Sequence, residues 1–168
     1  MDQHSIEAII RALNQAQVRY LIAGGLAVVA HGYVRFTADL DLILDLKVEN
    51  SQRALQALAG LGYQPRAPVD LGDFANATRR RQWVQDKGLT VFSLFSHEHP
   101  ATEVDLFVEM PFDFGPAYVA AARLEVAPGV AATFVSYEHL LQLKRQAGRP
   151  VDLDDIAKLA ATRPPPTT

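Results

Sequence analysis

The sequence contains no cysteine. Disulfide bonds and thiolate metal sites are therefore excluded; this leaves the compartment open but suits a reducing cytoplasm, which is the location we expect. Long apolar runs are also missing, since no stretch approaches the ~20 apolar residues that a membrane-spanning helix requires. The first residues, MDQHSIEAII, contain neither a basic region nor an uninterrupted apolar region, so we expect no secretory signal.

The chain also lacks an excess of charge of one sign. Its 168 residues carry 16 Lys and Arg against 19 Asp and Glu, a formal net charge of −3. This balance gives no overall attraction to nucleic acid, although it is compatible with a local basic patch. Hydrophobic residues make up 49% of the chain, which at this length is enough for one sizeable core. We therefore predict a single domain over residues 1–162 and a disordered or polyproline-like, proline-rich tail over residues 163–168.

The chain is organised around residues 20–45, which read YLIAGGLAVVAHGYVRFTADLDLILD. An apolar run rich in β-forming residues ends at Gly24-Gly25 and predicts a short buried strand. The following residues, 25–31, predict a short apolar helix. Because the free N–H groups and the dipole of a helix N-terminus favour an anion, Gly24 and Gly25 are candidates for binding phosphate.

Two carboxylates follow in a predicted strand over residues 38–44. Side chains alternate across a strand with period 2, so Asp39 and Asp41 should share one face. Asp105 lies among hydrophobic residues in a second predicted strand, over residues 102–109. Three such carboxylates converging would make an oxygen-rich site suited to Mg²⁺. The alternative for each strand is a solvated polar face opposite a buried one.

The rest of the chain alternates between helical and strand patterns. Besides the segments above, we predict helices at 5–17, 49–61, 75–85, 113–122, 136–146 and 151–161, and strands at 18–23 and 89–95, with two short strands within 124–135. We expect the strands at 89–95 and 102–109 to form an antiparallel hairpin. Strands clustered among helices indicate an α+β or α/β domain with a mixed sheet.

The motifs, taken together, resemble the nucleotidyltransferase (polymerase beta-like) superfamily: GG, thirteen residues, DLD, and a later EVDLF strand. The segments AGGLAVVAHGYVRFTADLDL and SYEHLLQLKRQAGRPVDLDDI are similar to the AbiEii toxin-like group, so the resemblance covers about residues 20–159. It implies the α+β nucleotidyltransferase fold, a mixed sheet flanked by helices with C-terminal helices. It also implies an active enzyme, because all three acidic positions are occupied.

The resemblance also implies roles for single residues. Gly24 and Gly25 would form the turn that receives the triphosphate, with backbone N–H groups replacing the serine hydroxyl that many relatives have at the second position. Asp39 and Asp41 would hold Mg²⁺. Asp105 would complete the metal site and help deprotonate the acceptor hydroxyl.

Four further residues complete the expected nucleotide site. Lys144 would neutralise phosphate charge as a point cation, although it also reads as a solvent-facing helix lysine. Asp155 matches a late acidic position of the toxin-like group, and Asp152 competes for that role. Arg35 and Thr37 precede the acidic pair closely enough to touch phosphate, although a solvent-facing loop arginine is equally compatible with the sequence.

Three other clusters carry weaker signals. His31, near a helix end, is expected to be a packing histidine. The segment His97-Glu98-His99 has metal-binding residue types but no third ligand, which disfavours a zinc site. The run Arg79-Arg80-Arg81 is typical of a solvated helix face, or of the most basic patch available if the acceptor were RNA.

These observations predict a Mg²⁺-dependent enzyme that moves NMP from an NTP to a hydroxyl acceptor. The acceptor would be an RNA or tRNA end, a protein side chain or a small molecule. The toxin role of a toxin–antitoxin pair is favoured, with an antitoxin or a second copy of the chain as possible partners and no membrane involvement. The alternatives are a non-catalytic nucleotide-binding module of the same fold and a metal-dependent phosphohydrolase.

Overall fold

The computed structural model describes residues 1–162. Helices and short strands alternate along the chain. The helices are α1 (Gln3–Gln15), α2 (Gly24–Ala30), α3 (Val48–Ala59), the 3-10 helix η1 (Leu71–Ala75), α4 (Ala77–Lys87), α5 (Phe114–Val119), α6 (Tyr137–Ala147) and α7 (Pro150–Thr162). The strands are β1 (Tyr20–Ile22), β2 (Asp39–Leu44), β3 (Gln64–Pro65), β4 (Val91–Phe95), β5 (Glu103–Phe107), β6 (Ala122–Ala127) and β7 (Val130–Phe134). The predicted tail at 163–168 lies outside the described residues.

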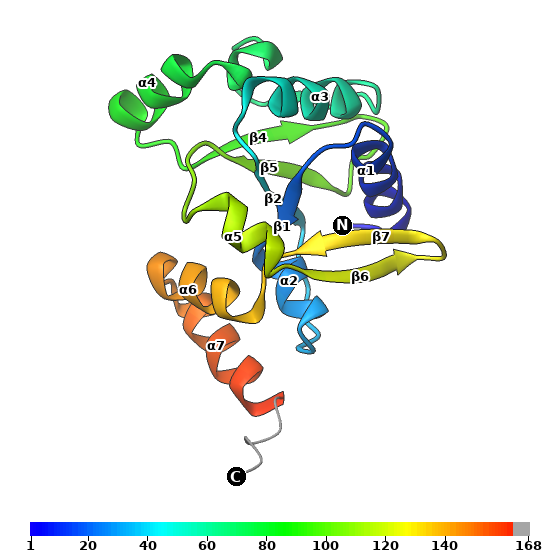
Figure 1. Ribbon diagram of the computed structural model, residues 1–168, viewed down its shortest axis with the longest axis vertical. Coiled ribbons are helices and arrows are strands. Elements are labelled where there is room, and N and C mark those ends of the chain that lie inside the picture. The colour runs from blue at the N-terminus through cyan, green and yellow to red at the C-terminus, as the bar shows by residue number, and fades with distance from the viewer. Residues whose placement is uncertain (163–168) are drawn as a thin grey trace.

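The strands form one mixed sheet in the order β3-β4-β5-β2-β1-β7-β6 (Figure 1). Two neighbouring pairs, β2 with β5 and β1 with β7, run parallel, and the other four run antiparallel. The predicted hairpin of β4 and β5 is confirmed. The mixed sheet with flanking helices confirms the predicted α+β class.

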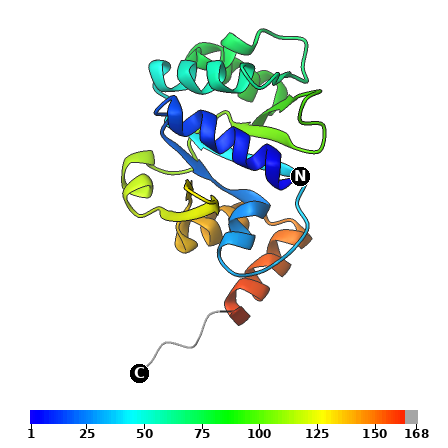
Figure 2. The ribbon, with the colours of Figure 1, turned by 90° about the vertical axis from the view of Figure 1, so that its right-hand side faces the viewer.

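The central strands carry the core of the molecule. Leu21, Ile22, Leu42 and Ile43 are fully buried in β1 and β2, which places the glycine turn and the acidic strand at the middle of the sheet. Helices α1 and α3 contact each other and lie along the upper part of the molecule in Figure 2. Helices α6 and α7 form a pair at the other end, where α6 also contacts α2 (Figure 1).

Two helices begin before their predicted first residues. Helix α1 begins at Gln3, because the Asp2 side chain caps it by accepting a hydrogen bond from the backbone N–H of Ser5. Helix α3 begins at Val48, directly after Lys47. In its first turn, the Asn50 side chain bonds the backbone of Arg19 and Asp45 and joins the start of β1 to the end of β2. A polar residue at a helix start thus has competing uses that local sequence does not rank.

Helix α4 follows its sequence signals closely. Asn76 caps it by accepting from two backbone N–H groups, and Gly88 ends it in the left-handed conformation. Within residues 1–162, no helix is long and apolar enough to cross a membrane.

Candidate active site

Two acidic strands lie side by side at the centre of the sheet. Strand β2 alternates between half-buried Asp39 and Asp41 and fully buried leucines, which confirms that the two aspartates share a face. Its parallel neighbour β5 pairs in register, with Asp41 opposite Asp105 and Asp39 opposite Glu103. Residues opposite each other on neighbouring strands have adjacent side chains. The sheet therefore brings the three predicted carboxylates together.

The glycine turn lies directly against this acidic cluster. The backbone N–H of Ala23 donates to the carbonyl oxygen of Asp41 over 2.9 Å, which fixes the turn on β2. Gly24 has a φ of +59°, and a Cβ at this position would lie 1.7 Å from the Asp41 carboxylate oxygen Oδ2. The turn needs glycine both for its backbone conformation and for the close approach of Asp41.

The loop between α2 and β2 covers the second glycine. A Cβ on Gly25 would meet Thr37 Oγ1 at 2.4 Å and the Arg35 guanidinium at 2.9 Å. Arg35 and Thr37 are therefore held beside the turn, and their contact with phosphate stays a prediction. Phe36, between them, is 82% exposed.

Burial and neighbouring negative charge raise the pKa of two of these carboxylates, Asp41 and Asp105. Burial, followed by the charges of Asp105 and Asp39, raises the pKa of Asp41 to about 6, against the opposing effect of Lys144 and Arg149. Burial also raises the pKa of Asp105, with contributions from Asp39 and Glu103, while a hydrogen bond from Ser93 lowers it. Ionised carboxylates that repel one another favour binding of a cation.

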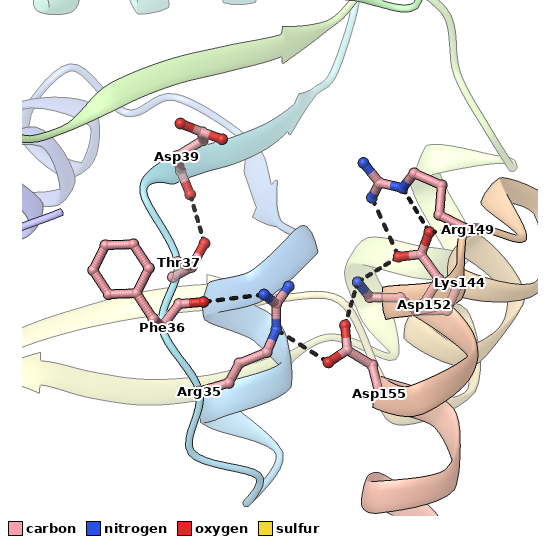
Figure 3. A network of polar contacts seen from close by, with 8 residues as sticks. All are labelled: Arg35, Phe36, Thr37, Asp39, Lys144, Arg149, Asp152 and Asp155. Atoms are coloured by element: carbon pink, nitrogen blue, oxygen red, sulfur yellow. Dashed lines mark hydrogen bonds and ion pairs between the residues drawn. The ribbon is translucent and has the colours of Figure 1, made fainter.

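A network of ion pairs from the C-terminal helices lies across from the acidic strands (Figure 3). Lys144 Nζ contacts Asp152 Oδ1 at 2.8 Å and Asp155 Oδ2 at 2.7 Å. Arg35 Nε pairs with Asp155 Oδ1 at 3.1 Å, and Arg149 Nε pairs with Asp152 Oδ2 at 2.7 Å. Burial opposes ionisation of Asp152, but the hydrogen bonds from Arg149 and Lys144 outweigh it and lower its pKa to about 2.

Both groups of charges face one cavity of about 780 Å³. Of the residues predicted from sequence, its lining includes Gly24, Gly25, Arg35, Thr37, Asp39, Asp41, Asp105 and Lys144. The structure thus brings eight of the nine predicted site residues to one cavity. The ninth, Asp155, is fully buried behind the cavity wall, whereas its competitor Asp152 lines the cavity.

Two basic features are less exposed than the sequence indicated. Lys144 is not a solvent-facing lysine, since only 4% of its side chain is exposed. Arg80 is buried, and its Nη1 donates to the carbonyl oxygen of Phe74. The run of three arginines therefore does not form one exposed patch, because Arg80 is turned into the protein.

The side chains of His31 and His99 both have partners within the protein. His31 is a packing histidine as predicted, with Nε2 within 2.8 Å of the carbonyl oxygen of Val135. His99 is buried, stacks on Tyr63 and lies 2.8 Å from the hydroxyl of Ser5. These partners account for both rings.

Phe36 and Arg149 are among the cavity-lining residues that sequence reasoning missed. The signal for Arg149 was its place between Gly148 and Pro150, because a residue between two helix breakers is held at a turn rather than on a helix face. Gly148 ends α6 in the left-handed conformation, with a φ of +62°. For Phe36 the sequence gives no signal beyond its place between Arg35 and Thr37.

Gly24→Ala tests how closely the turn approaches the acidic strand. Gly88→Ala is the matched control, because Gly88 has nearly the same φ, +61°, and a Cβ there meets nothing within 4 Å. Both variants should lose about 1–2 kcal/mol of stability from the left-handed backbone. Gly24→Ala should in addition displace Asp41 and reduce kcat/KM for a reaction in this cavity by about 100-fold. Equal kcat/KM in the two variants would show that the close approach of Asp41 has no functional role.

The chain matches no protein-family profile and no curated protein sequence. Among solved structures it is similar to ANT(2")-Ia in complex with adenylyl-2"-tobramycin, at 16% identity and a TM-score of 0.56, over 95% of this chain and 87% of that one. It is also similar to TM1012 of Thermotoga maritima, described as a candidate nucleotidyltransferase, at 13% identity and a TM-score of 0.56, over 95% and 92% of the two chains. The solution structure of the antibiotic-resistance factor ANT(2")-Ia gives a TM-score of 0.55 at 18% identity, over 90% and 77%. At these identities the likeness shows the fold.

Proposed function

We propose that this chain uses its nucleotidyltransferase fold to transfer NMP from an NTP to a hydroxyl acceptor, releasing pyrophosphate. The observation that carries the proposal is the in-register pairing of Asp41 with Asp105 beside the Gly24 turn, within one cavity. Carboxylates next to a glycine turn provide groups both for a metal and for phosphate.

The three carboxylates fit a Mg²⁺ ion that both the protein and the nucleotide would coordinate. Among residues 1–162, no group of three or more Asp, Glu and His side chains forms a metal site by itself. Mg²⁺ is commonly held by one or two carboxylates together with substrate phosphates. Burial, and after it the charge of neighbouring carboxylates, raises the pKa of Asp41 and of Asp105, and a bound divalent cation would offset both effects. Asp39, Asp41 and Asp105 are the proposed ligands. When bound, Mg²⁺ would neutralise charge on the phosphates during displacement.

Each acidic residue has its own part in the proposed reaction. Asp39 and Asp41 hold the metal-binding face of β2. Asp105 accepts the proton of the acceptor hydroxyl, whose oxygen forms the new bond to the α-phosphorus while the bond from that phosphorus to pyrophosphate breaks. A carboxylate with a raised pKa is a better proton acceptor than an ordinary aspartate, and the pKa of Asp105 is raised.

For the acceptor, we propose the toxin role of the AbiEii-like group, with an RNA or tRNA end or a protein side chain as the target and an antitoxin as the partner in the cytoplasm. Support comes from the resemblance of the GG–DLD stretch and of the segment that forms α6 and α7. Small molecules are the second acceptor class, because ANT(2")-Ia, which shares the fold, is found in complex with adenylyl-2"-tobramycin.

The decisive experiment is incubation with Mg²⁺ and each NTP labelled at the α-phosphate, together with tRNA, total protein or an aminoglycoside. The proposal expects label on one acceptor and release of pyrophosphate. Free NMP or inorganic phosphate without labelled acceptor would instead support a phosphohydrolase. A thermal shift with NTP but no product with any acceptor would support a non-catalytic binding module.

A further inference from the structure

The charged network at the α6–α7 turn contains three cations and two carboxylates. The cations are Lys144, Arg35 and Arg149, and the carboxylates are Asp152 and Asp155 (Figure 3). The network therefore has one net positive charge. Which cation presents this charge to the cavity depends on how each one is buried and paired.

Lys144 is poorly placed to meet a nucleotide. Its ammonium group lies between two carboxylates, and only 4% of its side chain is exposed. An ammonium group has three donors; one bonds Asp152, and Asp155 lies in ion-pair contact at 2.7 Å. A phosphate could approach only the small exposed part of this ammonium, where the two carboxylates already offset its charge.

Arg35 is also engaged. Its Nε pairs with the buried Asp155, its Nη1 donates to the carbonyl oxygen of Phe36, and 23% of its side chain is exposed. These contacts tie the loop before β2 to helix α7. They leave Arg35 a limited surface toward the cavity.

Arg149 differs from both. Its side chain is 68% exposed and lines the cavity that contains Asp39, Asp41 and Asp105. Nε and Nη2 donate to Asp152, and Nη1 has no hydrogen-bond partner among the described residues. In Figure 3 the guanidinium extends from the helix pair toward the side of β2.

Asp152 holds this arginine in place at three points. It accepts hydrogen bonds from Nε, from Nη2 and from the backbone N–H of Arg149, the last over 3.2 Å. Asp152 is itself fully buried and fixed by Lys144. Arg149 is therefore anchored along one edge, and its other edge faces the cavity. A planar guanidinium with a free edge is suited to binding a phosphate group.

We infer that Arg149 binds the triphosphate of the NTP in this cavity and that Asp152 is its positioning residue. Lys144 is then the buried centre of the network, holding Asp152 and Asp155 rather than touching the nucleotide. This inference rests on the proposed function, because it assumes an NTP beside the acidic strands, and it moves the phosphate-binding role from Lys144 to Arg149.

The test measures anion binding without catalysis. Binding of inorganic tripolyphosphate and of α,β-methylene-ATP, each with Mg²⁺, is measured by calorimetry for the wild type, Arg149→Ala, Arg149→Lys and Arg145→Ala. Arg145 is the matched control, because it is an exposed arginine in the last turn of α6, four residues before Arg149, and does not line the cavity. Thermal unfolding of each variant verifies that it is folded.

Arg149→Ala should bind both ligands about 10- to 100-fold more weakly, the loss expected for one charged hydrogen-bonding partner. Arg145→Ala should stay within about twofold of the wild type, since an exposed charge outside the cavity is screened by salt. Arg149→Lys should lose most of the affinity, because a lysine cannot dock against Asp152 and present a second edge at once. Asp152→Asn should weaken binding in the same way, and more strongly with Arg149 present than in the Arg149→Ala background.

If Arg149→Ala bound both ligands with wild-type affinity, the inference about Arg149 would be overturned. The proposal of NMP transfer would be unaffected, because it is tested separately with labelled NTP. Equal weakening by Arg149→Ala and Arg145→Ala would also overturn the inference about Arg149, because general charge and not a positioned guanidinium would then be responsible. Absence of NMP transfer by the wild type, despite Arg149-dependent binding of tripolyphosphate, would instead refute the proposed function alone.

Discussion

Asp41→Asn is expected to abolish nucleotide transfer and at the same time to stabilise the metal-free protein. Loss of a proposed metal-binding carboxylate would remove several kcal/mol of charge stabilisation at the reacting phosphate, which corresponds to a decrease of about 1000-fold or more in kcat/KM. The neutral amide also removes the cost of burying the Asp41 charge and the repulsion of that charge by Asp105 and Asp39, which together raise the pKa of Asp41 to about 6. The site thus contains a negative charge that the proposed function requires and that folding disfavours.

The stability gain should depend on pH in a defined direction. The folded protein binds a proton at Asp41 more tightly than the unfolded chain does, because the pKa rises from 3.8 to about 6. Wild-type stability should therefore fall as the pH rises from about 4 to about 6 and then level off. Above pH 6, Asp41→Asn should be more stable than the wild type by about 1–3 kcal/mol, and below pH 4 the difference should vanish.

Thermal and denaturant unfolding at several pH values, with and without Mg²⁺, measures this effect. Mg²⁺ should stabilise the wild type at pH 7–8 and stabilise Asp41→Asn less. Asp86→Asn, an exposed position on α4, is the control for removal of a negative charge and should change neither stability nor transfer appreciably. A variant Asp41→Asn that retained full transfer would contradict the proposed role of Asp41.

Lys144→Met is expected to cause the largest loss of stability. It leaves Asp152 and Asp155 buried without the ammonium group that lies 2.8 Å and 2.7 Å from them. Removing one partner of a buried ion pair typically costs about 3–5 kcal/mol. Lys158→Met on the exposed face of α7 is the matched control, and its effect should be within about 0.5 kcal/mol.

A double-mutant cycle separates the ion pair from the loss of packing. Asp155→Asn in the Lys144→Met background should recover part of the lost stability, because one uncompensated charge is removed. Denaturant unfolding of the four proteins in the cycle gives the coupling free energy. If Lys144→Met and Lys158→Met unfolded alike, the buried network would contribute nothing to stability. Low activity of Lys144→Met alone would not identify a phosphate contact, since the whole helix pair depends on this side chain.

Local rules were sufficient for the acidic strand itself. Period 2 placed Asp39 and Asp41 on one face and Leu40 and Leu42 in the core, as observed. The position of Asp105 opposite Asp41, in contrast, does not follow from local rules. Nothing in the local sequence states that β5 lies parallel to β2, because strand order depends on the connections across the whole sheet. That convergence was predicted from the superfamily resemblance.

The sequence analysis did not predict the burial of Lys144, although helical spacing gave one indication of it. Leu140 and Lys144 are four residues apart, so they lie on the same face of a helix, and Leu140 is fully buried. The carboxylates that make burial of an ammonium tolerable come after the break at Gly148, where helical spacing no longer applies. The orientation of α7 against α6 therefore decides the environment of Lys144, and this orientation cannot be predicted from the spacing of apolar residues.

The parallel pairing of β2 with β5 also fixes the order in which the site is completed during synthesis. The glycine turn and Asp39 and Asp41 emerge early, but the strand that supplies Asp105 follows only after α3, α4 and β4. Pairing strands that are so far apart in the chain requires closure of a long loop, which is slow compared with local structure formation. Arg149 and Asp152 emerge later still. A nascent chain thus has its glycine turn well before it has the carboxylate and the cation that complete the cavity.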